Sequence, residues 1–126
     1  MDIDAFWRDV ISQNKEKLPA YFHENAIIRW HCTNEQFTAA EYIRANCAYP
    51  GSWDGAIVRL EYAGNTVILA GRVWPEDQSA SFHVVSFLTI KDGKIWEMDE
   101  YWADDGEAPA WRRSMRIGKP LSTGGK

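Results

Sequence analysis

Apolar residues recur with two different periods along the chain. In the first fifty residues, apolar positions three and four residues apart lie between polar ones, as on one face of a helix. Later, short runs rich in β-branched and aromatic residues are separated by Gly, Asn, Asp and Pro. The pattern predicts helices first and an antiparallel sheet afterwards, which is an α+β arrangement.

Three helices are predicted. The first spans residues 2–15, is capped by Asp2 or Asp4, and has one apolar face formed by Ile3, Phe6, Trp7, Val10 and Ile11. A short helix follows near residues 18–22, with Pro19 in its first turn. The third begins at Thr38, where Glu41 completes a capping box, and ends before Pro50.

The strands are predicted from runs bounded by turn residues. A short strand at residues 26–30 is followed by a turn at 31–37. From residue 56 to about 103, four runs joined at Gly64-Asn65, at PEDQ and at Asp92-Gly93 form three consecutive hairpins. A curved sheet that closes only partly, with the helices over its concave face, leaves a cavity.

Size and charge restrict the function. The chain has 126 residues, which we interpret as one domain over residues 1–120 with a flexible tail at 121–126. The net charge of −4 argues against nucleic acid as a partner, because phosphate binding needs a basic face. Seven tryptophans predict either an aromatic core or an aromatic-lined cavity.

Several sites and segments are not expected. No run approaches about 18 apolar residues, so no membrane partner is predicted, and the first residues have no secretory pattern. We therefore expect a cytoplasmic protein with free thiols at Cys32 and Cys47. Neither metal-ligand spacing nor a Gly-rich phosphate loop or nucleophile elbow is present, so no metal and no cofactor are predicted.

Three stretches carry a family resemblance. YFHENAIIRW, FTAAEYIRANC and FLTIKDGKIWEMDEYW together resemble the SnoaL-like branch of the nuclear transport factor two-like superfamily, over roughly residues 3–105. The resemblance implies a cone-shaped, cystatin-like α+β barrel: a curved antiparallel sheet with N-terminal helices covering its concave face and a pocket at one end. It also implies a homodimer, which we expect to form through the convex sheet face. Isomerases, cyclases, epoxide hydrolases and plain binding modules share this fold, so the fold does not determine the function.

One acid in the last strand is predicted to point inward. Alternation places Trp96, Met98, Glu100 and Trp102 on one face, whereas Asp104 and Asp105 are assigned to a solvated loop after the strand. A glutamic acid between tryptophans is desolvated, which raises its pKa and suits general acid–base catalysis. The cyclase branch of the family has an acid at this position. The alternative is a structural carboxylate, hydrogen-bonded or paired with Arg29, Arg44 or Arg72.

The resemblance also locates two missing acids. The isomerase branch has its catalytic base where this chain has Trp30, and its second acid where this chain has Ser86. A ketosteroid isomerase reaction is therefore not expected, and Trp30 is interpreted as a pocket wall or a core residue. If the Ser86 face is concave, His83 lies on the convex face.

The remaining site candidates lie near the expected pocket opening. His31 is either a proton shuttle or a solvated loop residue. On the third helix, Tyr42, Asn46 and Tyr49 can face the cavity or make helix–sheet contacts. His23 is interpreted as structural.

Three functional classes follow. The first is a module that binds a small, largely apolar ligand among Trp30, Tyr42, Asn46, Tyr49, Ser86, Trp96, Met98 and Trp102. The second is a cofactor-free lyase, isomerase or cyclase in which Glu100 moves the proton, with His31, Ser86 or Asn46 binding the polarised oxygen. The third is a pure interaction domain with a filled cone. A hydroxyl or histidine beside Glu100 favours the enzyme, whereas an arginine favours a structural carboxylate.

Overall fold

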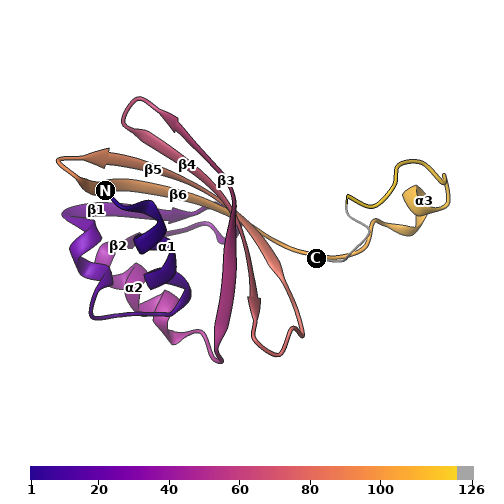
Figure 1. Cartoon of the computed structure of the whole chain (residues 1–126), viewed down its shortest axis with the longest axis horizontal. Coiled ribbons are helices and arrows are strands. Elements are labelled where there is room, and N and C mark those ends of the chain that lie inside the picture. Colours follow the sequence, from indigo (N-terminus) through magenta and orange to yellow (C-terminus); the bar gives the residue numbers. More distant parts are fainter. Residues whose placement is uncertain (122–126) are drawn as a thin grey trace.

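A single curved sheet of six strands organises the molecule. The computed structural model describes residues 1–121. The strand order is β2-β1-β6-β5-β4-β3, and the strands are β1 (Phe22–Trp30), β2 (Glu35–Thr38), β3 (Trp53–Ala63), β4 (Thr66–Pro75), β5 (Phe82–Lys91) and β6 (Lys94–Asp104). The sheet curls around the two N-terminal helices without closing on itself (Figure 1). The predicted α+β architecture, with helices in the concavity of a bent sheet, is confirmed.

The three predicted hairpins form the long side of the sheet. β3 pairs with β4, β4 with β5, and β5 with β6, all antiparallel. In the second turn Gln78 has a positive φ of 59°, and in the other two the residues with positive φ are Gly64 at 62° and the pair Asp92 and Gly93 at 54° and 74°. These are the turn residues that the sequence indicates, because glycine and aspartate adopt this backbone region at low cost.

The sheet is antiparallel except where its first strand meets its last. β1 runs parallel to β6, with Ile28 beside Met98 and Trp30 beside Glu100. The predicted turn at 31–37 is wrong in part, because it contains a 3-10 turn, η2 (His31–Thr33), and the edge strand β2. Asn34, with φ 58°, turns the chain so that β2 can pair back onto β1.

The helices begin where predicted, but the first is shorter than predicted. α1 (Ile3–Ile11) is capped by Asp2, which accepts a hydrogen bond from the Ala5 amide at 3.0 Å. It stops before residue 15 because Gln13 takes a left-handed conformation, with φ 56°. The predicted second helix is a 3-10 turn, η1 (Leu18–Tyr21). α2 (Ala39–Ala48) has the complete capping box between Thr38 and Glu41.

Both helices pack their apolar sides against the concave face of the sheet. The core contains Ile3, Phe6 and Trp7 from α1, Tyr42 and Ile43 from α2, and inward-facing residues of the strands such as Leu69, Leu88 and Met98. Gly71 of β4 lies directly under the Trp7 indole, where no larger residue fits. This contact sets the distance between α1 and the sheet.

The C-terminal segment leaves the sheet after β6. It contains one short helix, α3 (Ala110–Arg113), and extends away from the curved sheet (Figure 1). Trp111 is 65% exposed, so it does not cover the concave face. The predicted flexible tail at 121–126 lies outside the described residues apart from Leu121. No helix in the described part of the chain is long and apolar enough to cross a membrane.

Candidate functional site

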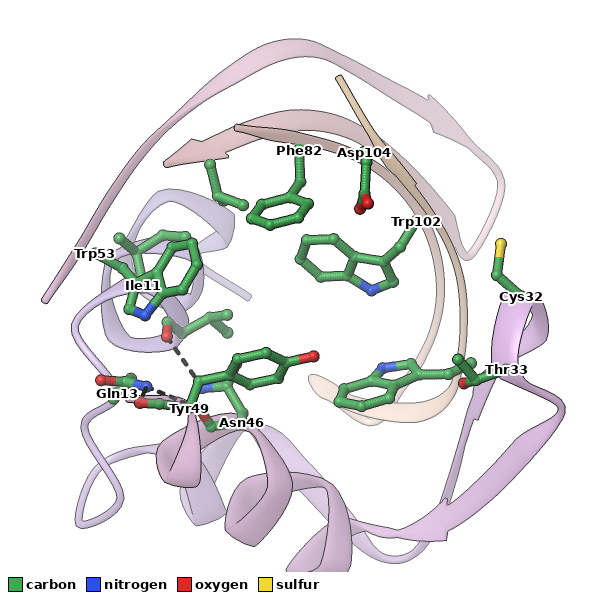
Figure 2. A pocket seen from close by; sticks show the side chains of 13 residues that line it. Ile11, Gln13, Cys32, Thr33, Asn46, Tyr49, Trp53, Phe82, Trp102 and Asp104 are labelled. Carbon is green, nitrogen blue, oxygen red and sulfur yellow. Dashed lines mark hydrogen bonds between the residues drawn. The ribbon is translucent and has the colours of Figure 1, made fainter. Parts of the chain in front are cut away.

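A cavity of about 350 Å³ lies at one end of the concave face, between the two helices and the sheet. This volume is at the lower end of the range for small-molecule pockets, roughly 300–1,000 Å³. The lining is mainly aromatic and aliphatic, with rings from Trp30, Tyr49, Trp53, Phe82 and Trp102 and aliphatic groups from Val10, Ile11 and Val73. Figure 2 shows the rings of Tyr49, Phe82 and Trp102 directed into this space.

Strand register explains how the sheet side of the cavity is built. Val73 of β4, Phe82 of β5 and Asp104 of β6 are directly paired across three neighbouring strands. Paired residues present their side chains on the same face. The Phe82 ring lies 5.8 Å from the Trp53 ring, which comes from the start of β3. Trp102, two residues before Asp104, continues the same face of β6.

Asp104 is a lining residue that the sequence interpretation missed. The strand was expected to end near residue 103, which left Asp104 in a solvated loop. Instead β6 continues through Asp104, and Asp104 points into the mouth of the cavity beside Phe82 and Trp102 (Figure 2). Extending the alternation of Met98, Glu100 and Trp102 by one step would have found it.

Glu100 lies on the same face of β6, two residues before Trp102, and is 6% exposed. Its neighbours on the two adjacent strands are Trp30 of β1 and Ser86 of β5. Trp30 Nε1 donates to one carboxyl oxygen at 2.9 Å, and Ser86 Oγ donates to the other at 2.5 Å. The middle position of β6 between β1 and β5 is therefore what gives this buried acid two neutral donors.

Burial raises the pKa of the Glu100 carboxyl above its ordinary value of 4.5. The donors Ser86 and Trp30 stabilise the ionised form and oppose this rise in part. The Trp102 N–H acts in the same direction, although it is too poorly placed for an ordinary hydrogen bond and has no partner. Burial also raises the pKa of Tyr42, and the nearby charge of Glu100 adds to that effect.

Arginine does not neutralise Glu100. Arg29 points to the convex side, where it contacts Glu97 at 2.9 Å and Asp99 at 3.2 Å. Arg72 contacts Asp105 at 3.4 Å. Neither of these predicted pairs with Glu100 forms, and no ion pair within residues 1–121 includes Glu100 or Arg44. Glu100 is absent from the cavity lining, whereas Trp30, which donates to its carboxyl group, and Trp102 are part of that lining.

The predicted ligand-binding residues fall into three groups. Trp30, Asn46, Tyr49 and Trp102 line the cavity. Tyr42, Ser86 and Met98 are almost completely buried in the layer behind the lining. Trp96 is at the opposite end of β6 and does not contact the cavity.

A β-bulge changes the expected face of Trp96. Thr89 pairs with Glu97 and Ile90 pairs with Ile95, so Trp96 has no partner and the alternation skips a residue. Ile95, fully buried, takes the inward position that the sequence pattern gave to Trp96. The Trp96 ring instead packs 4.5 Å from the His23 ring and 4.5 Å from the Lys91 ammonium.

The histidines lie away from Glu100. His31 Nε2 contacts Asp99 Oδ1 at 2.7 Å, and its ring stacks on Tyr101 at 4.5 Å, so it belongs to the convex face. His83 is also on the convex side and pairs with Asp105. The structure therefore does not bring His31 and Glu100 together as an acid–base pair.

The described residues contain no cluster of possible metal ligands. No three His, Cys, Asp or Glu side chains within residues 1–121 gather closely enough to hold a metal ion. Cys32 and Cys47 are free, and Cys32 is among the residues that line the cavity.

Comparison with other proteins supports the family and the fold. The sequence model of the SnoaL-like domain matches residues 3–98. The match ends before Glu100 and Asp104, so the roles of these two acids depend on geometry alone. No curated protein matches the chain in sequence.

Solved structures share the fold at low identity. A candidate ketosteroid isomerase from Kribbella flavida DSM 17836 is 22% identical with a TM-score of 0.78, covering 94% of this chain and 87% of its own. An NTF2-like protein of unknown function from Burkholderia xenovorans LB400 is 19% identical with a TM-score of 0.75, covering 94% and 91%. A hypothetical protein with a ketosteroid isomerase-like fold from Catenulispora acidiphila DSM 44928, solved in complex with trimethylamine, is 14% identical with a TM-score of 0.66, covering 79% and 84%.

Proposed function

We propose that this chain, which belongs to the SnoaL-like domain family, binds a small, largely apolar organic molecule in the aromatic cavity of its concave face. The observation that carries the proposal is the composition of the lining. Five aromatic side chains surround a space of about 350 Å³, and the N–H groups of two of them, Trp30 and Trp53, donate to groups outside the lining. Flat or apolar groups fill such a space favourably, because their burial removes both surfaces from water.

The position of Glu100 favours binding over catalysis. A general acid or base must come within hydrogen-bonding reach of the proton it moves. Trp30 and Trp102 line the cavity whereas Glu100 does not, and both Glu100 oxygens already accept hydrogen bonds. The trimethylamine complex of the Catenulispora protein supports the idea that domains of this shape hold small organic molecules.

An exposed tyrosine at the cavity provides a direct test of binding. Tyr49 lines the cavity and is 55% exposed, so Tyr49→Ala should leave the fold intact. We expect it to weaken an apolar ligand such as naphthalene about tenfold, since one aromatic contact contributes about 1.4 kcal/mol. Quenching of the tryptophan fluorescence on titration measures the dissociation constant.

Tyr62→Ala is the matched control for Tyr49→Ala. Tyr62 is 66% exposed and lies on β3 outside the cavity lining. It should bind like the wild type. Equal weakening by both variants, or no effect of Tyr49→Ala on a ligand that binds, would place the ligand elsewhere.

A second candidate function is a cofactor-free lyase, isomerase or cyclase that uses Glu100 as general acid or base. Its support is the raised pKa of a buried carboxyl with a serine hydroxyl, and no arginine, beside it. Such an enzyme needs its substrate to reach Glu100, which does not line the cavity. In an enzyme of this kind, Glu100→Gln would abolish turnover while the substrate still binds. A pure binding module has no turnover to lose, so this result separates the two functions.

The convex face is proposed to pair with a second copy of the chain. Phe87 and Tyr101 are 38% and 45% exposed there, and their rings contact each other edge to face at 6.2 Å. We expect Phe87→Glu to shift the protein to monomer in sedimentation equilibrium, because two new carboxylates would face each other across a two-fold interface. A wild type that is already monomeric at micromolar concentration would contradict the proposal.

A further inference from the structure

We infer that the ligand of the cavity is a small organic ammonium ion, whose charged group lies beside the Asp104 carboxylate and against the aromatic rings around it. This inference rests on the proposed ligand-binding function and adds the chemical class of the ligand. Three independent features of the lining carry it: its net charge, the arrangement of its rings, and the polarity of its hydrogen-bonding atoms.

The charge of the lining is negative and uncompensated. Asp104 is the one carboxylate in the cavity lining, and no Lys, Arg or His side chain lines the cavity within the described residues. The adjacent Asp105 faces the other side of the strand, where Arg72, His83 and Ser81 contact it. Asp104, in contrast, makes no ion pair or side-chain hydrogen bond within residues 1–121. The Asp104 carboxylate is exposed to solvent and is free to pair with a cationic ligand.

The rings form a continuous surface next to this carboxylate. Tyr49 and Trp53 lie 6.1 Å apart, and Trp53 and Phe82 lie 5.8 Å apart. Phe82 is the direct cross-strand neighbour of Asp104, so its ring and the carboxylate stand side by side (Figure 2). A cation within about 6 Å of an aromatic face is attracted by the ring quadrupole, and alkylated ammonium groups combine this attraction with apolar contact.

Several hydrogen-bond donors of the lining are already used inside the protein, whereas the buried N–H of Trp102 has no partner. Trp30 Nε1 donates to Glu100, and Trp53 Nε1 donates to the Pro50 carbonyl at 3.0 Å. Asn46 Nδ2 donates to the Val10 carbonyl at 3.0 Å. Gln13 Nε2 is held by the carbonyls of Asn46 and Tyr49. Such a lining disfavours an anion and suits a cation.

The test compares two ligands of the same shape and different charge. Benzyltrimethylammonium and its uncharged carbon isostere, neopentylbenzene, differ only in the central nitrogen or carbon. We expect the wild type to bind the cation at least fivefold more tightly. Asp104→Asn keeps the side-chain shape and should weaken the cation about tenfold while changing the isostere less than twofold. Fluorescence titration and calorimetry at 0.15 M salt measure both.

Asp54→Asn is the control for the overall charge of the protein. Asp54 is an exposed aspartate on β3 outside the cavity lining, so its loss removes one negative charge at the same end of the sheet. It should change neither affinity. Equal weakening by Asp54→Asn, or a cation bound no better than the isostere, would overturn the ammonium inference and leave apolar binding intact. If neither compound binds, the proposed function fails together with the inference.

Discussion

Glu100→Ala is expected to lower the free energy of unfolding by about 3 kcal/mol at pH 7, while Glu100→Gln changes it by less than about 1 kcal/mol. The alanine leaves a cavity and removes the acceptor of two buried donors, and each of these losses costs of order 1–3 kcal/mol. The donors are Trp30 Nε1 and Ser86 Oγ. A glutamine keeps the volume and can accept from Trp30 while donating to Ser86.

Urea unfolding of the two variants and the wild type checks this difference. Glu97→Ala is the matched control, because Glu97 is the same residue type on the same strand but faces the convex side and pairs with the half-buried Arg29. It should cost about 1 kcal/mol or less. A glutamine variant as unstable as the alanine variant would show that the ionised carboxylate itself holds the strands together.

The wild type and Glu100→Gln should also differ in how their stability depends on pH, and the sign of this difference can be predicted. Burial raises the pKa of Glu100 in the folded state above the ordinary value of 4.5, so the folded state holds this proton at pH values where the unfolded state has released it. The stability contribution of Glu100 is therefore complete below about pH 4.5 and falls as the pH rises through the window above that value.

Glu100→Gln has no such titration. The unfolding free energy of the wild type minus that of the glutamine variant should decrease from pH 4 towards the folded-state pKa and then level off. Other titrating groups contribute equally to both proteins and cancel. A difference that grows with pH would mean that the hydrogen bonds from Ser86 and Trp30 outweigh burial.

Gly71→Ala is expected to destabilise the protein by about 3 kcal/mol, the upper part of the range for overpacking a core. A methyl group at Gly71 would lie 2.8 Å from Cζ3 of Trp7 and closer still to Cη2, so the indole must move. Trp7 is 9% exposed and packs among α1 and the strands, which leaves little room for that movement. Thermal and urea unfolding measure the loss.

Two further variants identify the cause of this effect. Gly106→Ala adds a methyl group with no atom within 4 Å and should stay within about 0.5 kcal/mol of the wild type. Trp7→Phe shortens the ring and also removes a buried N–H that has no hydrogen-bond partner. The loss of unfolding free energy in the double variant should be smaller than the sum of the losses in the two single variants. Additive losses would rule out the Trp7 contact as the cause.

Local signals in the sequence determined most of the elements. The capping box at Thr38 and Glu41 and the hairpin turn at Asp92-Gly93 are contained within a few residues, and both occur as predicted. The inward direction of Glu100 also followed from alternation along the last strand, whereas that of Ser86 came from the family resemblance. The errors in the side-chain directions have two causes. The bulge at Trp96 interrupts the alternation, and β6 continues to Asp104, one residue beyond its predicted end.

The sequence by itself determined the α+β class, the meander of four strands, and an inward acid on the last strand, because periodicity and turn chemistry are local properties. Only the tertiary structure decided what surrounds that acid. The parallel pairing of β1 with β6 brings together Trp30 and Glu100, which are seventy residues apart, and it places His31 on the opposite face. Which strands become neighbours, and which side chains then line the cavity, depends on long-range packing that no local pattern encodes.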